Sequence, residues 1–218
     1  MAQIIAVLTG DVVGSRDLGA DGLDRLFAAL EAAVSEMAGW PGQTDKPPFA
    51  RYRGDGWQLA LNNPALALRA TLVARGAVKA ADKRFDTRIG VGIGPASVQD
   101  INEIGQASGV PFEAAGKALD DLSGPIRFGY RSDNRYPEHD NLLDACLALA
   151  DACSADWTQA QAEVMSRFLL DSGLTHKAIG ESLNPPISQQ TVWRHFHAAR
   201  GPALELAINR VETNWKTA

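Results

Sequence analysis

The stretch RYRGDGWQLAL (51–61) decides how the first half of this chain folds. Two strand-like runs meet at residues 54–56, and an Asp-Gly pair between two such runs is a strong signal for a β-hairpin. The turn itself needs only Asp-Gly, so a carboxylate flanked by Arg53 and Trp57 invites a further explanation. We therefore consider Asp55 both as a turn residue and as a candidate ligand for a metal ion.

The hairpin lies inside an alternation of strands and helices. Short apolar runs predict strands, and apolar residues that recur every three or four positions predict helices. The predicted elements, in chain order, are a strand over 3–11, a helix over 21–40, hairpin strands over 48–53 and 56–61, a helix over 64–81, a strand over 87–98, a helix over 111–124 and a strand over 125–130. Alternate glycines in the 87–98 strand are expected to permit close approach of another backbone. This order predicts an α+β (α/β) domain with a mixed sheet and helices on one face.

A change of composition divides the chain. The segment RSDNRYPEHDN (131–141) is polar and contains proline, and the sequence beyond it reads almost entirely as helix. Helices are predicted over about 142–153, 158–171, 175–183, 188–199 and 202–215. We therefore expect two domains: residues 1–132 form the mixed α/β domain, 133–141 are a linker, and 142–218 form an all-α domain.

Composition and charge exclude some classes of function. The chain has 218 residues, of which 45% are hydrophobic and 22% charged, which is enough for a sizeable core. A formal charge of −5 gives no general affinity for nucleic acid or for an anionic membrane, so either kind of binding needs a local patch. No apolar run approaches the ~20 residues of a membrane span.

Two features favour a cytoplasmic protein. The first residues, MAQIIAVLTGDVVG (1–14), lack a basic leader and are interrupted by Asp11, so they do not read as a signal peptide. Cys146 and Cys153 lie seven positions apart on one predicted helix, which holds them too far apart to bond to each other. They are expected to be buried thiols.

Two aspartates are candidate metal ligands. Asp11 stands at the end of the first predicted strand and Asp55 at the tip of the hairpin, so a sheet with a central first strand would bring both to one cleft. Mg²⁺ takes oxygen ligands and usually keeps waters and substrate phosphates, so two carboxylates are a sufficient contribution from the protein. The Gly14-Ser15 turn adds backbone N–H groups suited to a triphosphate. The alternative is structural, with Asp55 completing a turn and Asp11 capping one.

These motifs resemble a known family. Three of them, in this order and spacing, resemble the core of class III nucleotide cyclases: GDVVGS (10–15), RYRGDGW (51–57) and RIGVGIGP (88–95). A longer set, which with the helical tail covers nearly the whole chain, resembles more closely the SatD-like bacterial proteins: TGDVVGSR (9–16), GDGWQ (54–58), IGVGIG (89–94) and ASGVPFEAAGKAL (107–119). The resemblance implies a cyclase-like (ferredoxin-like) domain followed by a helix-turn-helix. It also implies that Asp11 and Asp55 bind Mg²⁺ or Mn²⁺, assisted by the Val12 carbonyl.

The resemblance further implies roles for residues at the cyclase substrate positions. Glu113 and Lys117 stand where cyclases carry an Asn and an Arg that steady the ribose and the transition-state charge. A carboxylate facing the sugar and a lysine in place of a forked guanidinium both weaken the case for turnover. Their alternative is a surface ion pair. Arg51 falls near the base-reading lysine of cyclases, and Gln106 near its acidic partner. The candidate nucleotide contacts are therefore Gly14, Ser15, Arg51 and Gln106.

The segment LLDSGLTHKAIGESLNPPISQQTVWRHFHAAR (169–200) predicts a helix-turn-helix. Thr175 caps a first helix and Ser188 a second, and NPP (184–186) breaks the chain between them. The second helix would enter the major groove, so residues near its start would reach base edges and phosphates. The candidate DNA-binding residues are Ser188, Gln189, Gln190, Arg194 and His195.

Charge argues both ways for DNA binding. From Glu138 to Ala218 there are six Lys/Arg and ten Asp/Glu residues, and an acidic domain is repelled by DNA. Residues 184–200 contain Arg194, Arg200 and two histidines but no acid, so a local basic face survives. The alternative is that the helices serve packing or dimerisation. A single helix-turn-helix seldom binds alone, so DNA binding through residues 174–200 predicts a homodimer on a two-fold site.

Three functional hypotheses follow. In the first, which we favour, a metal-nucleotide-binding sensor domain is coupled to a DNA-binding tail in a bacterial transcriptional regulator. In the second, the chain is an active nucleotidyl cyclase or related nucleotidyltransferase that uses the tail for dimerisation or targeting. In the third, the cyclase-like domain is only a dimerisation platform. Glu113 and Lys117 favour the first over the second, and Asp11 and Asp55 favour both over the third.

Overall fold

The computed structural model describes residues 3–43, 45–52, 54–97, 104 and 107–215. Its elements, in chain order, are β1 (Gln3–Val12), α1 (Ser15–Glu36), β2 (Phe49–Tyr52), β3 (Gly56–Leu61), the 3₁₀ helix η1 (Pro64–Leu66), α2 (Ala67–Ala81), β4 (Thr87–Ala96), α4 (Val110–Asp120), β5 (Phe128–Ser132), α5 (Pro137–Ser154), α6 (Gln159–Leu170), α7 (His176–Ser182), α8 (Gln189–Ala198) and α9 (Gly201–Trp215). The mixed α+β fold class is confirmed, and the C-terminal part is all helical.

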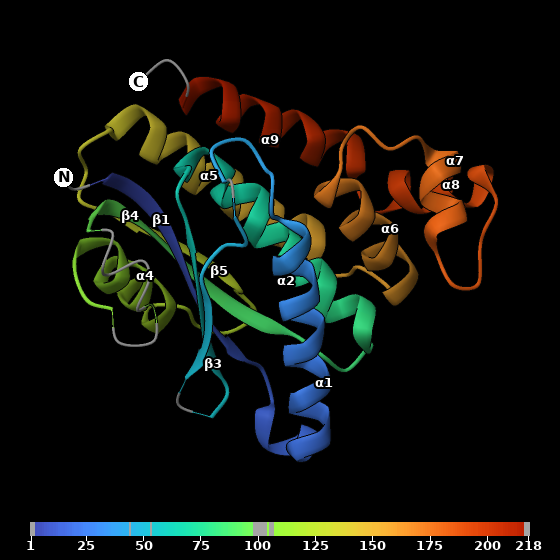
Figure 1. Ribbon diagram of the computed structural model, residues 1–218, viewed down its shortest axis with the longest axis horizontal. Coiled ribbons are helices and arrows are strands. Elements are labelled where there is room, and N and C mark those ends of the chain that lie inside the picture. The colour runs from blue at the N-terminus through green and yellow to red at the C-terminus, as the bar shows by residue number, and fades with distance from the viewer. Residues whose placement is uncertain (1–2, 44, 53, 98–103, 105–106, 216–218) are drawn as a thin grey trace.

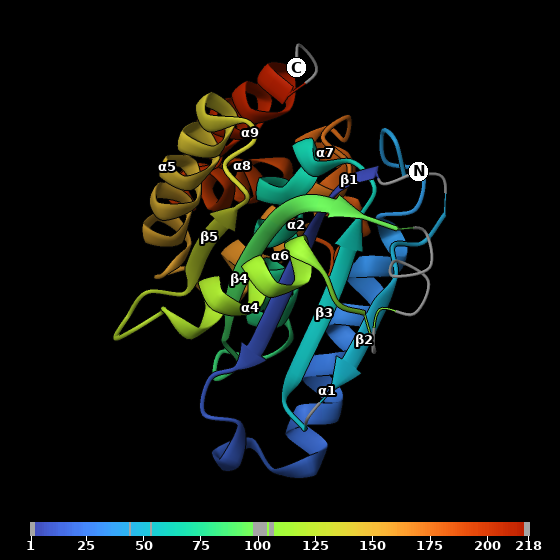
Figure 2. The ribbon, with the colours of Figure 1, turned by 90° about the vertical axis from the view of Figure 1, so that its left-hand side faces the viewer.

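The described strands form one mixed sheet with β1 at its centre (Figure 2). The order is β2-β3-β1-β4-β5. β1 runs antiparallel to both neighbours, whereas β4 and β5 pair in parallel. Along β1, Ile5 and Val7 pack on one face while Ala6 and Leu8 pack on the other, which is typical of a strand covered on both sides. The central place of β1 brings its end beside the β2–β3 hairpin.

Helices cover both faces of the sheet, so the expectation of helices on one face is wrong. α1 and α2 lie on one face and α4 lies on the other (Figure 2). The reason is the row of glycines Gly90, Gly92 and Gly94 in β4. A Cβ atom at Gly92 would lie 2.1 Å from the carbonyl oxygen of Pro111, and one at Gly90 would lie 2.2 Å from that of Ala115. The α4 backbone therefore rests directly on the strand, as the alternation of glycines predicts.

One hydrophobic core joins the sheet to the C-terminal helices. α2 is buried along most of its surface because the sheet and α1 contact it on one side and α6 on another (Figure 1). Trp40, which follows α1, donates its indole N–H to the carbonyl of Leu170 at the end of α6, 3.0 Å away. Arg69 of α2 pairs with Glu212 of α9 at 2.6 Å. The α/β part and the helical part therefore share buried side chains.

α5 begins at Pro137, inside the segment expected to be a linker. Proline in the first turn, with Glu138 and Asp140 close behind, is a typical helix start. Asp140 is buried and accepts hydrogen bonds from the hydroxyl groups of Tyr130 and Ser132, the latter at 2.7 Å. Residues 137–141 are therefore helical, and the connection to β5 spans only 133–136.

Two further expectations concern the cysteines and the membrane. Cys146 and Cys153 are both free thiols, as their spacing on one helix predicts, but only Cys146 is buried and Cys153 is half-buried. Throughout the described ranges, the helices lack the combination of length and apolar character that a membrane crossing needs.

Candidate functional site

Asp11 and Asp55 meet at one end of the sheet. The antiparallel pairing of β1 and β3 places Asp11 opposite Gly56, the residue after Asp55. Ser15, the first residue of α1, donates its hydroxyl to Asp55 Oδ2 at 2.5 Å. The end of β1, the hairpin tip and the start of α1 therefore converge, as Figures 1 and 2 show. Three of the candidate residues, Asp11, Ser15 and Asp55, are thus neighbours.

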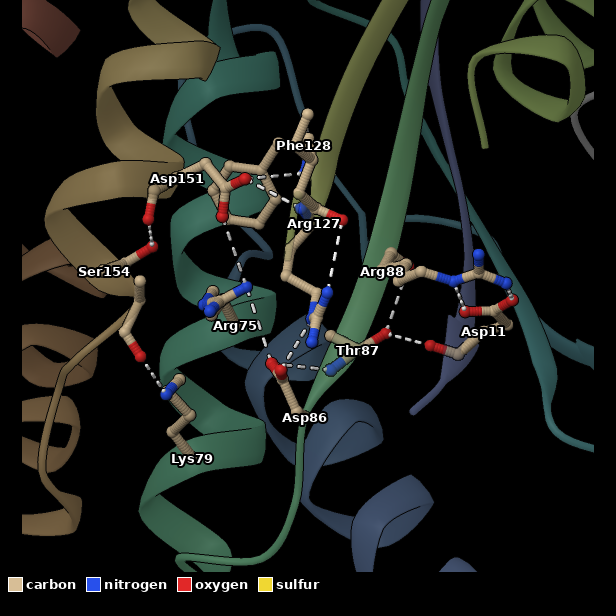
Figure 3. A network of polar contacts seen from close by, with 12 residues as sticks. Asp11, Arg75, Lys79, Asp86, Thr87, Arg88, Arg127, Phe128, Asp151 and Ser154 are labelled. Atoms are coloured by element: carbon tan, nitrogen blue, oxygen red, sulfur yellow. Dashed lines mark hydrogen bonds and ion pairs between the residues drawn. The ribbon is translucent and has the colours of Figure 1, made fainter. Parts of the chain in front are cut away.

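Arg88 of β4 completes this end of the sheet, although no motif had singled it out. Its backbone stands opposite Asp11 in the β1–β4 register. Arg88 Nε donates to Asp11 Oδ1 at 2.9 Å and Nη2 donates to Oδ2, so the contact is bidentate (Figure 3). The arginine opens the RIGVGIGP motif, but only the strand register shows what its side chain faces. We call Asp11, Ser15, Asp55 and Arg88 the carboxylate end.

The Asp11–Arg88 pair lies on the α4 face of the sheet and is partly open to solvent. Ile5 and Val7 of β1 pack on that face, and the alternation of side chains along the strand puts Asp11 there too. The side chain of Asp11 is 24% exposed and that of Arg88 is 37% exposed. Neither partner is locked into the core.

Negative charge predominates around Arg88. Its hydrogen bonds to Asp11 raise the pKa of the guanidinium, burial lowers that pKa, and the nearby charges of Asp11, Asp120 and Asp55 raise it further. The electrostatic surroundings of Arg88 are therefore acidic, which favours a cation at this place.

The donor set at the carboxylate end fits a hard divalent cation. Within the described residues, no group of three or more His, Cys, Asp or Glu side chains is placed to hold a metal ion. Asp11, Asp55 and the backbone carbonyl of Val12 therefore suit only a cation that keeps waters and substrate oxygens, as Mg²⁺ and Mn²⁺ do. The Arg88 guanidinium lies against both Asp11 oxygens, so a cation at Asp11 would compete with it.

The turn before α1 is the candidate phosphate contact. Gly14 has a φ of 66°, in the left-handed region that favours glycine, and no described side chain caps the start of the helix. Gly19 departs from helical geometry after one turn, so the dipole of the remaining helix is not aimed at Ser15. A phosphate at Gly14 and Ser15 would therefore be held by individual N–H and hydroxyl groups.

Arg51 lies at the hairpin turn, where its Nε donates to the Gly54 carbonyl at 3.1 Å, but the rest of its guanidinium faces α1. Its guanidinium carbon lies 4.2 Å from the centroid of the Phe27 ring, and its Nη1 lies 2.9 Å from Asp24 Oδ1. Both partners belong to α1, so Arg51 points to the face opposite Asp11. Gln106, its implied partner in reading the base, lies outside the described residues.

Glu113 and Lys117 lie on the solvent side of α4. Both side chains are exposed, while the buried side of the helix, with Ala115 and Leu119, packs on the sheet. Position 117 thus carries a lysine with solvent around it and no buried setting that would hold it in one geometry.

The predicted caps of the helix-turn-helix are confirmed. Thr175 Oγ1 accepts a hydrogen bond from the backbone N–H of Ala178 at 3.2 Å, which caps α7. Ser188 Oγ accepts one from the backbone N–H of Thr191 at 3.2 Å, which caps α8. Both helices therefore begin where the sequence predicts.

α7 and α8 pack closely at a glycine. A Cβ atom at Gly180 would lie 2.3 Å from the carbonyl oxygen of Ile187, so α7 touches the segment that leads into α8. Ile179, Val192 and Phe196 are buried between the helices. The pair forms a tight two-helix unit at one extreme of the molecule (Figure 1).

The outer face of α8 carries most of the candidate DNA-binding residues. Gln189, Gln190 and Arg194 are exposed. Ser188 is also exposed, but its hydroxyl serves the cap, and His195 is half-buried. A solvent-facing start of the second helix is the arrangement that base reading requires.

Trp193 is a feature of this face that the motif reading missed. Its side chain is 52% exposed and its ring centroid lies 4.2 Å from that of His197. The sequence does indicate this position, because Trp193 stands three residues after Gln190 and the two side chains therefore lie on the same side of the helix.

Comparisons with known proteins do not place the chain in a family. No protein-family model matches it, and a search of curated proteins finds no match. Function is therefore inferred from the geometry of the carboxylate end and of the α7–α8 unit.

Proposed function

We propose that this chain binds a nucleotide together with Mg²⁺ or Mn²⁺ at the carboxylate end and binds DNA through α7 and α8. It would act in the cytoplasm as a dimeric bacterial transcriptional regulator of the SatD-like type. The observation that carries the proposal is the hydrogen bond from Ser15 to Asp55, since it fixes the hairpin tip beside the strand end where Asp11 stands.

Asp11, Ser15 and Asp55 of the carboxylate end, together with Gly14, have roles in this proposal. Asp11 and Asp55 are the residues that hold the cation, and Ser15 positions Asp55. Gly14 and Ser15 offer N–H groups to the phosphates. When bound, the cation supplies positive charge to the phosphate oxygens. Arg51 contacts both α1 and the hairpin turn, and this proposal gives it no role.

The proposal is of binding and not of turnover. A cyclase stabilises the charge that develops in the transition state with a guanidinium held in place. Such electrostatic stabilisation depends on hydrogen-bond donors that are already positioned before the reaction. Glu113 and Lys117, at the implied transition-state positions, are exposed on α4. Support for an active cyclase would therefore have to come from a product assay.

Metal-dependent nucleotide binding tests the first half. The purified full chain is titrated by calorimetry with nonhydrolysable analogues of the four nucleoside triphosphates, in the presence of Mn²⁺ or Mg²⁺. We expect Asp11→Asn and Asp55→Asn each to weaken binding by more than the roughly 10–100-fold that loss of an outer-shell partner costs, because each removes a charged ligand.

Asp133→Asn is the matched control for that titration. Asp133 also pairs with an arginine, Arg135, at 3.2 Å, and its side chain is 23% exposed against 24% for Asp11. Unchanged binding in Asp11→Asn would remove the nucleotide half of the proposal. Release of cyclic product or pyrophosphate from hydrolysable triphosphates would instead support the cyclase alternative.

Local charge and exposure support the DNA half. Residues 174–200 contain Lys177, Arg194 and Arg200 against the single acid Glu181, and they hold three of the four histidines of the chain. This segment is therefore basic although the chain is acidic, and phosphate contacts depend on such a local face.

Arg194→Ala tests the DNA half. We expect the wild-type protein to retain a fragment upstream of its own coding sequence in a gel-shift assay at low salt. Arg194→Ala should weaken retention by roughly 10-fold or more, since one base-reading contact is worth about 1–3 kcal/mol. Arg210→Ala, which removes the same charge from the exposed side of α9, is the control. Equal loss in both variants, or no retention by the wild type, would contradict this half.

A further inference from the structure

Arg88 occupies the place beside Asp11 that a cation would need. Its two donors take one oxygen each of the Asp11 carboxylate. The guanidinium takes one lone pair of each oxygen, and its positive charge repels a metal ion on the same carboxylate. Arg88 therefore competes with Mg²⁺ for Asp11, and its departure would favour the metal.

Arg88 is less confined than Arg75, the buried arginine of α2. Its side chain is 37% exposed, whereas that of Arg75 is 2% exposed. Its surroundings remain acidic after it leaves Asp11, because Asp55 and Asp120 lie close enough to act on its charge. An arginine displaced from one carboxylate seeks another anion, and its planar fork matches a phosphate as well as a carboxylate.

We propose that Arg88 is a counter-ion switch: it neutralises Asp11 in the metal-free protein and transfers to a phosphate of the nucleotide when a divalent cation takes Asp11. The inference rests on the proposed function and deepens it. Cation and nucleotide then bind cooperatively. The cation alone has to displace Arg88 from Asp11, and the nucleotide alone has to bind while Arg88 is still paired with Asp11. By linkage, each ligand raises the affinity for the other by the same factor.

Arg88→Gln separates the two roles of the side chain. The amide removes the positive charge from Asp11, so Mn²⁺ alone should bind about 10-fold more tightly than in the wild type. The same change removes the phosphate contact, so the factor by which nucleotide improves Mn²⁺ binding should fall from about 10–100-fold to below about threefold. Arg88→Lys keeps the charge without the fork and should lie between the two.

The experiment measures bound Mn²⁺ by electron paramagnetic resonance on the full-length protein. Each variant is titrated with Mn²⁺ alone and then with Mn²⁺ and a nonhydrolysable ATP or GTP analogue, and the analogue's own affinity for Mn²⁺ is measured in parallel. Arg135→Gln, which breaks a comparable exposed Arg–Asp pair with Asp133, is the control and should match the wild type. A urea titration confirms that Arg88→Gln is folded.

The outcomes separate the switch from the function. Tighter binding of Mn²⁺ alone together with lost coupling in Arg88→Gln supports the switch. Binding of metal and nucleotide by the wild type with an unchanged Arg88→Gln overturns the switch and leaves the proposed function standing. Absence of Mn²⁺ binding from both the wild type and Arg88→Gln, with or without nucleotide, overturns the proposed function.

Discussion

Two arginine–aspartate clusters flank Thr87, and they use the same chemistry in opposite ways (Figure 3). One is the carboxylate end, where Arg88 and Asp11 are partly exposed. The other, which we call the buried arginine cluster, consists of Arg75, Asp86, Arg127 and Asp151. Thr87 belongs to both surroundings, because its backbone N–H donates to Asp86 Oδ1 at 3.0 Å and its hydroxyl donates to the Asp11 carbonyl at 2.7 Å.

The buried arginine cluster fastens α5 to α2 and the sheet. Arg75 of α2 lies 3.5 Å from Asp86 and 3.6 Å from Asp151 of α5. Asp151 Oδ2 also accepts the backbone N–H of Arg127 at 2.7 Å, and Arg127 Nε lies 2.8 Å from Asp86 Oδ2. Burial lowers the pKa of Arg75, and the two carboxylates oppose that shift.

The difference between the clusters lies in solvent access and in satisfaction of hydrogen bonds. Arg75 is almost fully buried, and among the described residues its Nε and Nη1 atoms have no hydrogen-bond partner, nor has Asp151 Oδ1. Charges in such a place cannot exchange partners, because leaving one unpaired in the interior is expensive. Arg88 has a complete bidentate contact and an exit to solvent. The buried cluster therefore holds the fold, and the exposed one is available for exchange.

Of the effects that test this difference between the clusters, the largest is expected from Arg75→Ala. Removing the guanidinium leaves the buried Asp151 without its cation, while Asp86 keeps Arg127, so the free energy of unfolding should fall by about 3–5 kcal/mol. Urea denaturation measures it. Arg131→Ala, in an exposed pair with Asp121, should change the free energy of unfolding by about 1 kcal/mol or less. If Arg75→Ala lowers the free energy of unfolding no more than this control does, the buried arginine cluster does not stabilise the fold more than an exposed ion pair.

The smallest change in the free energy of unfolding is expected from Arg88→Gln. A partly exposed pair contributes about 0–1 kcal/mol to the free energy of unfolding, and salt screens it. The loss in Arg88→Gln should therefore be small in dilute buffer and vanish near 1 M NaCl, while the loss in Arg75→Ala persists. Parallel urea titrations at the two salt concentrations give the result. A large, salt-resistant loss in Arg88→Gln would mean that Arg88 is structural and cannot be exchanged.

The sequence predicted the fold closely where local patterns decide it. Alternating apolar runs, the Asp-Gly turn and the caps at Thr175 and Ser188 are local signals, and each marks an element that is present. The start of α5 was missed because a proline followed by acids reads as a polar connection, although it is also how helices begin. The glycines of β4 predicted a close backbone contact, but not that α4 would make it from the second face.

The candidate site was predicted less completely, because its geometry depends on pairing between distant segments. Asp11 and Asp55 are neighbours since β1 is central, which the pattern suggested. The Arg88–Asp11 contact depends on the register of β1 with β4, and a shift of one residue would turn Arg88 to the other face. Arg51 lies on the α1 face for the same kind of reason, since Phe27 and Asp24 hold it there.

The hydrogen bond between Trp40 and Leu170 makes α1 a link between the hairpin tip and α6. At the start of α1, Ser15 donates a hydrogen bond to Asp55 at the hairpin tip. Beyond the other end, Trp40 binds the carbonyl of Leu170, the last residue of α6, and Glu36 pairs with Arg167 of α6. The segment is not one straight rod, because the turn that carries Ser15 is joined at the non-helical Gly19 to a longer helix that runs on to Glu36. A displacement of the hairpin tip would therefore reach α6 through two helical pieces and the hinge between them.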